Sequence, residues 1–245
     1  GESALDAAVT GGSNTAIGKN ALTANTSGET NTALGSDALK SVISGNGNTA
    51  VGVQALEDNT GSSNTAVGQA SFRENTSGTN GTALGMFALK LNTTGSNNTA
   101  VGNESLEANT TASNNTAVGY QALTANTTGN QNVAVGAEAL DANTTGANNT
   151  SIGDSTLSAN TTASNNTAVG RAALNANTTG QQNTALGSLS LIANTTGGFN
   201  TAIGSESLEA NTTAANNTAL GWRSLHRNTT GASNTAVGKG ALEAN

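Results

Sequence analysis

The 245-residue chain contains no cysteine and no proline. Without cysteine it can have neither a disulfide framework nor thiolate metal ligands. The absence of proline excludes a collagen triple helix and suits a chain whose backbone N–H groups join continuous ladders. Only 2% of the residues are aromatic, and much of the 34% apolar content is alanine. We therefore expect no deep three-dimensional core of the kind found in an ordinary globular domain.

Charge is also scarce. Charged residues make up 9% of the chain, and the formal net charge is −7. A negative balance disfavours nucleic acid or an anionic membrane surface as a partner. No apolar run approaches the length of a membrane span, and no signal peptide is visible, so we expect no membrane insertion.

What the sequence does contain is one motif, repeated along its whole length. The consensus is N-T-A-[VIL]-G-x-x-[AS]-L-x-A-N-T-T-G-x-N, whose positions we number as slots 1 to 17. Slot 1 falls at Asn14, Asn31, Asn48, Asn64, Gly81, Asn98, Asn115, Asn132, Asn149, Asn166, Asn183, Asn200, Asn217 and Asn234. The intervals are 17 residues, except for 16 between Asn48 and Asn64. Repetition at a fixed short period is typical of a solenoid.

Residues 1–245 therefore form a single continuous array. The one-residue deletion lies within 59–64, between two intact motifs, and predicts a turn there, because turns tolerate changes of length. The chain begins at slot 5 with Gly1 and ends at slot 12 with Asn245, so both ends are cut within a repeat. We expect a segment of a longer product or a processed protomer.

The slots differ in how much variation they accept. Slot 5 is always glycine, slot 4 is always valine, isoleucine or leucine, and slot 9 is leucine except for Phe72. Slots 6, 7 and 10 accept almost any residue. Disordered segments do not keep such a pattern. Fixed apolar slots beside variable polar ones indicate stacked rungs, each with one buried side and one solvated side.

The motif NTAVG has the composition of a short solenoid strand. Its period of two places the slot-2 threonine and the slot-4 aliphatic residue on one face and the slot-3 alanine on the other. Slots 6–11, such as NESLEA at 103–108, fit either one helical turn or an extended segment with slots 9 and 11 inward; we favour the extended form. The residues of ANTTG are typical of a turn. We also expect ladders of identical asparagine side chains, running from rung to rung, at slots 1, 12 and 17.

The predicted fold is all-β: a parallel β-solenoid or β-roll of about fourteen 17-residue rungs, roughly 65–70 Å long. One valine and one leucine per rung make a thin core for a coil standing alone. Closed cyclic association would bury these columns further, so we expect a parallel homotrimer. A lone solenoid and an open-ended head-to-tail filament are the alternatives.

The motif also resembles known repeats. NTAVGYQALTANTTGNQN at 115–132 resembles the tandem repeats of bacterial and phage fibre proteins, including those that end in a self-cleaving intramolecular chaperone. The NTAVG core is similar to the rungs of trimeric autotransporter adhesin heads. The resemblance implies left-handed parallel β-rolls or intertwined three-chain fibres at a cell surface or on a virion. The rung here is longer than the adhesin-head rung, and no stalk, anchor or chaperone domain is visible.

No residue set points to catalysis, a cofactor or a metal. His226, the only histidine, occupies the variable slot 10, where a solvated surface residue is expected. Acidic residues recur in slot 10 without forming a fixed pair, so a glycosidase arrangement lacks support. They include Glu107, Asp141, Glu209 and Glu243, interrupted by Thr124, Ser158, Asn175 and Ile192. The glycines match neither the calcium-binding nonapeptide nor a phosphate loop. We predict that the chain is not an enzyme.

Three functions remain. The first is a structural shaft of an extracellular or virion fibre, assembled by self-association. The second is an adhesin or glycan-binding surface, for which Tyr120, Trp222, Phe87 and Phe199 are the candidates for sugar stacking; they are scattered over distant rungs. The third is ice binding, prompted by columns of threonine. Its weakness at this level is that the turn threonines fill neighbouring slots and so point in opposite directions. The many Asn-x-Ser/Thr glycosylation patterns are expected to reflect ladders.

Overall fold

The computed structural model describes residues 1–244, which divide into two compact units, 1–121 and 122–244. These residues form fourteen short strands and no helix, so none has a helix long and apolar enough to span a membrane. The first unit contains β1 (Thr15–Ile17), β2 (Thr32–Leu34), β3 (Thr49–Val51), β4 (Thr65–Val67), β5 (Thr82–Leu84), β6 (Thr99–Val101) and β7 (Thr116–Val118). The second contains β8 (Val133–Val135), β9 (Thr150–Ile152), β10 (Thr167–Val169), β11 (Thr184–Leu186), β12 (Thr201–Ile203), β13 (Thr218–Leu220) and β14 (Thr235–Val237).

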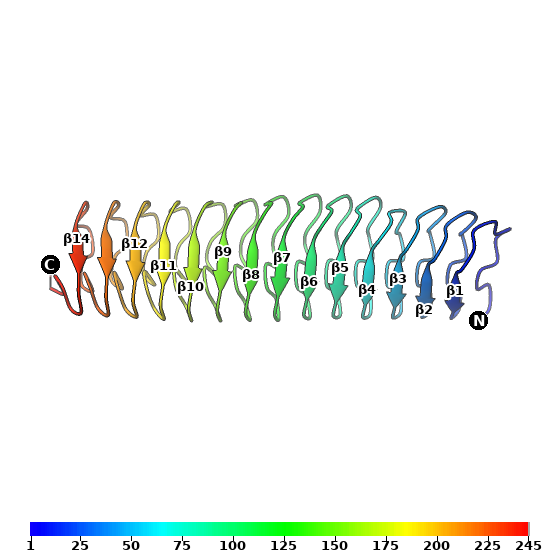
Figure 1. The fold of residues 1–245 in the computed structure, drawn as a ribbon, viewed down its shortest axis with the longest axis horizontal. Coiled ribbons are helices and arrows are strands. Elements are labelled where there is room, and N and C mark those ends of the chain that lie inside the picture. The colour runs from blue at the N-terminus through cyan, green and yellow to red at the C-terminus, as the bar shows by residue number, and fades with distance from the viewer. Residues whose placement is uncertain (245) are drawn as a thin grey trace. The chain divides into compact units, whose positions relative to one another are not determined.

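Within each unit every strand pairs in parallel with the strand of the next rung (Figure 1). The register joins each slot to the same slot of its neighbour, as in Thr15 opposite Thr32 and Ala16 opposite Ala33. The 16-residue rung does not disturb it, since Thr49 still lies opposite Thr65. The expectation of a parallel β-solenoid is confirmed. Residues 59–64, where the deletion lies, are outside the strands, with bends at 62 and 63. The final residue, which would complete slot 12, lies outside the described residues.

Alanine and leucine form the interior of the coil. Ala100 in slot 3, Ser105 in slot 8 and Leu106 in slot 9 are fully buried, and other rungs repeat this arrangement. The slot-4 residues lie on the opposite side of the strand, where Val67 keeps 39% of its surface exposed. The expectation that the fixed slot-4 column belongs to the buried side was therefore wrong. Because side chains alternate along a strand, only one face can point inward, and alanine leaves room for leucine from the opposite wall.

Slots 6–11 are a run of turns, so both the favoured extended segment and the single helical turn were wrong. Slots 7 and 9 adopt positive φ, as in Glu104 (57°) and Leu106 (51°). This conformation costs an L-residue roughly 1–2 kcal/mol. Hydrogen bonds between rungs hold it: the N–H of Glu104 donates to the preceding rung at Met86 (3.0 Å). Slot 8, and not slot 11, supplies the second small residue of the core.

Asparagine ladders run through slots 1 and 12, as predicted. In slot 1, the N–H of Asn48 donates to Oδ1 of Asn31 (2.9 Å) and its side-chain amide donates to the carbonyl of Gly61 (3.0 Å). In slot 12, the amide of Asn177 donates to Oδ1 of Asn160 (3.2 Å) and to the carbonyl of Gly180 (2.9 Å). The side chains of Asn48 and Asn177 are fully buried and hydrogen-bonded, as most buried polar groups are, whereas Nδ2 of Asn217 in slot 1 is buried without a partner among residues 1–244.

Slot 17 does not form the third ladder that was expected. Its asparagines, such as Asn97 and Asn165, are exposed and have φ of 58° and 63°. Asparagine tolerates the left-handed region better than most residues do, which accounts for its frequency in this slot.

The invariant glycine of slot 5 is required for two reasons. Gly102 has φ of +136°, a conformation that L side chains rarely adopt. A Cβ at this position would also lie 2.3 Å from the carbonyl oxygen of Gly119 in the next rung. The rungs can stack at this corner only because the side chain is absent.

The two exceptions to the consensus at slots 1 and 9 compensate each other. Phe72 replaces the slot-9 leucine, and Gly81 replaces the slot-1 asparagine of the following rung. A Cβ on Gly81 would lie 2.2 Å from Cε1 of Phe72, so the larger ring fills the space that an asparagine side chain takes in other rungs. The two substitutions therefore act as a pair.

This coupling predicts a double-mutant result. Phe72→Leu should destabilise the chain by about 1–3 kcal/mol by leaving a cavity, and Gly81→Asn by about 1–3 kcal/mol through overpacking. The double variant restores the consensus pair and should be more stable than the sum of the single changes predicts, by about 0.5–3 kcal/mol. Urea denaturation of the four proteins measures the coupling; additive effects would contradict it.

The buried ladder predicts a second difference in stability. Asn177→Ala removes three hydrogen bonds, two donated and one accepted from Asn194 (2.9 Å), and leaves buried partners unpaired. We expect a loss of at least about 2 kcal/mol in the free energy of unfolding. Asn165→Gly, at an exposed left-handed position, is the matched control and should change stability little. Thermal and urea melts test both variants, and equal effects would contradict the ladder's role.

Candidate functional site

One regular surface of each unit is the outward side of its strands. We define the strand face as the slot-2 and slot-4 side chains of β1–β7 in the first unit and of β8–β14 in the second. In most strands a buried central residue separates two side chains that are partly or fully exposed. Slot 2 is threonine in every rung but one, where it is Val133. Slot 4 adds an aliphatic column with exposed fractions of 37% at Leu84 and 44% at Leu220.

The threonine hydroxyls of the strand face have no hydrogen-bond partner among residues 1–244. No side-chain hydrogen bond within residues 1–244 involves a slot-2 hydroxyl, and none of these oxygens is buried. The turn threonines of slot 13 differ, since Oγ1 of Thr93 donates to the carbonyl of Thr110 in the next rung (3.0 Å). The strand face also carries no charged residue in either slot. It therefore presents free hydroxyls beside methyl groups.

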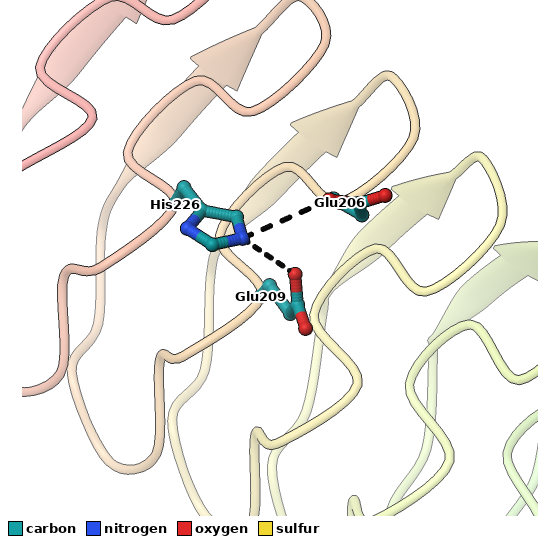
Figure 2. A group of neighbouring side chains, drawn as sticks. All are labelled: Glu206, Glu209 and His226. Carbon is teal, nitrogen blue, oxygen red and sulfur yellow. Dashed lines mark ion pairs between the residues drawn. The ribbon is translucent and has the colours of Figure 1, made fainter.

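A second candidate is a cluster formed by Glu206, Glu209 and His226 (Figure 2). Nε2 of His226 lies 2.7 Å from Oε2 of Glu209 and 3.8 Å from Oε2 of Glu206. Glu209 and His226 occupy slot 10 of adjacent rungs, so stacking alone brings them together. An imidazole nitrogen and two carboxylates, with ligand atoms within 4.8 Å of one another, are groups that Zn²⁺ accepts.

The same cluster has a competing cation of its own. Nε of Arg223 donates to Oε2 of Glu206 at 2.6 Å, and this contact raises the pKa of the guanidinium. A bound metal ion would have to displace this ion pair. The His226 side chain is 20% exposed, and its Nδ1 is buried without a partner. The sequence predicted a solvated surface histidine; the side chain is only partly exposed, and the slot-10 spacing was the signal that could have shown its partner.

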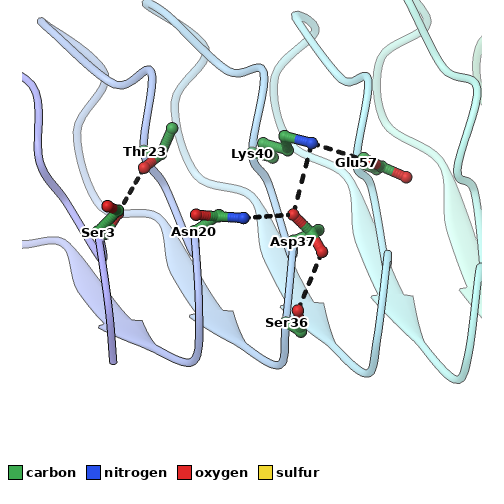
Figure 3. Close-up of polar contacts among 7 residues, drawn as sticks. All are labelled: Ser3, Asn20, Thr23, Ser36, Asp37, Lys40 and Glu57. Carbon is green, nitrogen blue, oxygen red and sulfur yellow. Dashed lines mark hydrogen bonds and ion pairs between the residues drawn. The ribbon is translucent and has the colours of Figure 1, made fainter.

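A polar network joins the first rungs of the first unit (Figure 3). The amide of Asn20 donates to Asp37 (2.9 Å), as does the hydroxyl of Ser36 (2.9 Å), and these bonds lower the pKa of the Asp37 carboxyl. Lys40 bridges Asp37 (3.4 Å) and Glu57 (3.5 Å), and its pKa is raised by their charges. Exposed pairs of this kind contribute little stability singly. They link rungs and do not enclose a site.

The remaining acidic residues of slot 10 do not come together in a common site. Glu107 pairs with Lys90 of the preceding rung (3.3 Å). Asp141 is half-buried, its Oδ1 lacks a partner, and burial raises the pKa of its carboxyl. No pocket is found in residues 1–244.

The four aromatic candidates for sugar stacking stay apart. Tyr120 and Trp222 both occupy slot 6, but in distant rungs, while Phe87 is in slot 7 and Phe199 in slot 17. The Trp222 ring is flanked by cationic groups, with Arg223 at 4.8 Å and Lys239 at 4.9 Å from its centre. No aromatic stripe forms among the described residues of either unit.

The Asp141 environment predicts a pH-dependent stability. A raised pKa means that the folded chain holds this proton at higher pH than the unfolded chain, so ionisation destabilises the fold at pH 7. Asp141→Asn should therefore stabilise the chain at neutral pH. The gain should shrink as the pH falls through the raised pKa and vanish below the ordinary value of 3.8. Thermal melts between pH 3 and 8 test this, with Asp154→Asn on the exposed surface as control; equal shifts in both variants would contradict it.

A comparison with protein-family models and with curated proteins finds no match for this chain. The resemblance to the repeats of fibre proteins therefore rests on the motif itself.

Proposed function

We propose that the chain is a non-catalytic structural shaft of an extracellular or virion fibre or filament. The observation that supports this best is the unbroken in-register stacking of rungs within each unit. Each rung is nearly the same as the next, so adding rungs adds length without altering the cross-section. Reach then scales with the number of rungs, and stability accumulates along one dimension.

The interior supports a shaft because it holds each rung to its neighbours at several points. Backbone bonds join the strands, and two buried asparagine ladders run beside them. The slot-13 hydroxyls add a further bond between rungs, as from Thr178 to the carbonyl of Thr195 (3.1 Å). A stack linked along several columns resists bending and shearing better than one linked by its strands alone.

The parallel homotrimer stays a prediction, as does head-to-tail polymerisation. The sequence argument for a trimer was that a single coil has too thin a core. The structure changes that reason, because leucine, alanine and asparagine close the core within one chain, and the slot-4 column lies outside it. The shaft proposal does not depend on the number of chains. Binding of a cell-surface glycan also stays a prediction, and the separated aromatic residues give it no particular support.

A deletion tests the shaft. Removing residues 149–199 takes out three whole rungs and joins slot 17 of one rung to slot 1 of the next. We expect a folded chain that is shorter by about 14 Å, at about 4.8 Å per rung. Removing residues 149–203 is the matched control, because it also takes slots 1–4 of the next rung, including strand β12, and should destabilise the stack. Electron micrographs give the particle length, and circular dichroism melts give the stability.

The same proteins distinguish the function of a structural shaft from that of an adhesin. Specific binding of the full chain to one oligosaccharide on a glycan array would contradict a purely structural role. An in-register deletion that failed to shorten the particle would contradict the stacking of rungs as the source of length.

A further inference from the structure

The strand face is a regular surface for which the shaft has no use. In a shaft that works through its length, nothing requires slot 2 to be threonine, because its hydroxyl bonds to no group of the described residues 1–244. Nothing in the core requires slot 4 to be aliphatic, because that side chain points outward. Both slots are nevertheless nearly uniform, with threonine in thirteen of fourteen rungs and valine, isoleucine or leucine in all. We propose that the strand face binds the surface of ice.

The geometry supplies a grid. Neighbouring strands lie about 4.8 Å apart, and slots 2 and 4 of one strand lie about 6.7 Å apart, two residues at about 3.3–3.4 Å each. Because the register is exact, the grid repeats without a slip through all seven strands of each unit. The 16-residue rung keeps the grid too, since its deleted residue lies in the turn. A single small ligand would contact only two or three rungs, whereas a crystal surface extends over all of them.

The chemistry of the grid suits ordered water. Each threonine offers one hydroxyl that is free to donate and accept, and one methyl group. Water beside methyl groups is restricted in its orientations. Valine, which fills slot 4 in seven of the fourteen rungs, has the branched shape of threonine with a methyl in place of the hydroxyl; leucine or isoleucine fills the other seven. Neither slot holds a charged residue that would attract a disordered hydration shell.

The main objection at the sequence level was that ice binding needs two columns on one strand. The turn threonines do not provide them. The hydroxyls of slot 13 bond to the next rung, as from Thr144 to the carbonyl of Thr161 (3.1 Å). The strand supplies the pair instead, because slots 2 and 4 are two residues apart and point the same way. The second column is aliphatic and not threonine.

Two other periodic partners are less well matched. A crystalline polysaccharide would also repeat along the face, but recognition of sugars relies on aromatic stacking, and slots 2 and 4 contain no aromatic residue. Another copy of this chain would cover the aliphatic column, but it would leave the threonine hydroxyls to be paired or desolvated. Ice satisfies both columns at once.

The first test uses the whole chain. We expect the purified protein to lower the freezing point below the melting point of ice, to inhibit ice recrystallisation and to enter growing ice. Size-exclusion chromatography with light scattering should give a species whose strand face is open to solvent. A folded chain without any of these ice activities overturns the proposal. A trimer without ice activity overturns it in favour of self-association, and retention on crystalline cellulose without ice activity overturns it in favour of a polysaccharide.

The second test uses matched variants. Thr82→Lys with Thr99→Lys places two long charged side chains on the strand face of the first unit. Thr94→Lys with Thr111→Lys places the same charges in slot 14, at two exposed turn positions of that unit. We expect the first pair to lose most of the freezing-point depression and the second to keep it. Thr82→Val with Thr99→Val preserves the shape of the face and should retain part of the activity.

Circular dichroism melts establish that each variant folds before its ice activity is compared. Equal loss in the slot-2 and slot-14 lysine variants would overturn the assignment to the strand face. The proposal is independent of the shaft: loss of ice activity in the slot-2 variant should leave particle length unchanged, and the in-register deletion tests length without touching the remaining strand faces.

Discussion

The hydrogen bond from one rung to the next is the interaction on which the structure depends. Backbone N–H groups bond partly to the preceding rung and partly to the following one, as those of Gly52 and Thr49 do. Each slot therefore stands over the same slot of its neighbours. A shift by one residue would turn every strand side chain to the opposite face and misalign both asparagine ladders. This constraint explains why the period is kept within one residue through fourteen copies.

Exact stacking also makes a thin core sufficient. A rung buries little more than alanine, leucine and two asparagines, but each of these side chains packs against its own copies above and below. Departures from the consensus are then corrected locally. Phe72 occupies the space left by Gly81. Ser151 replaces a slot-3 alanine, and its hydroxyl donates to the carbonyl of Thr156 (2.8 Å). The buried polar group that the substitution introduces is thus satisfied.

The same register makes the outside of the coil periodic. An ordinary globular surface presents one site, whereas this surface presents one short pattern many times. The partners that match such a surface are themselves periodic, such as a crystal lattice or other copies of the chain. Single departures in the variable slots, such as the contact of His226 with Glu209, join two adjacent rungs and do not extend along the array.

The sequence by itself determined the period, the parallel stacking of rungs and the asparagine ladders of slots 1 and 12. Each follows from a pattern that repeats in register, and repetition is visible without coordinates. Only the tertiary structure decided which strand face points inward and that slots 7 and 9 adopt left-handed conformations. Alternation shows which residues share a face, but the choice between faces depends on the volume left by the opposite wall, where Leu106 and its equivalents lie. The left-handed turns depend on hydrogen bonds to other rungs. The local conformational preferences of leucine and glutamate do not predict them.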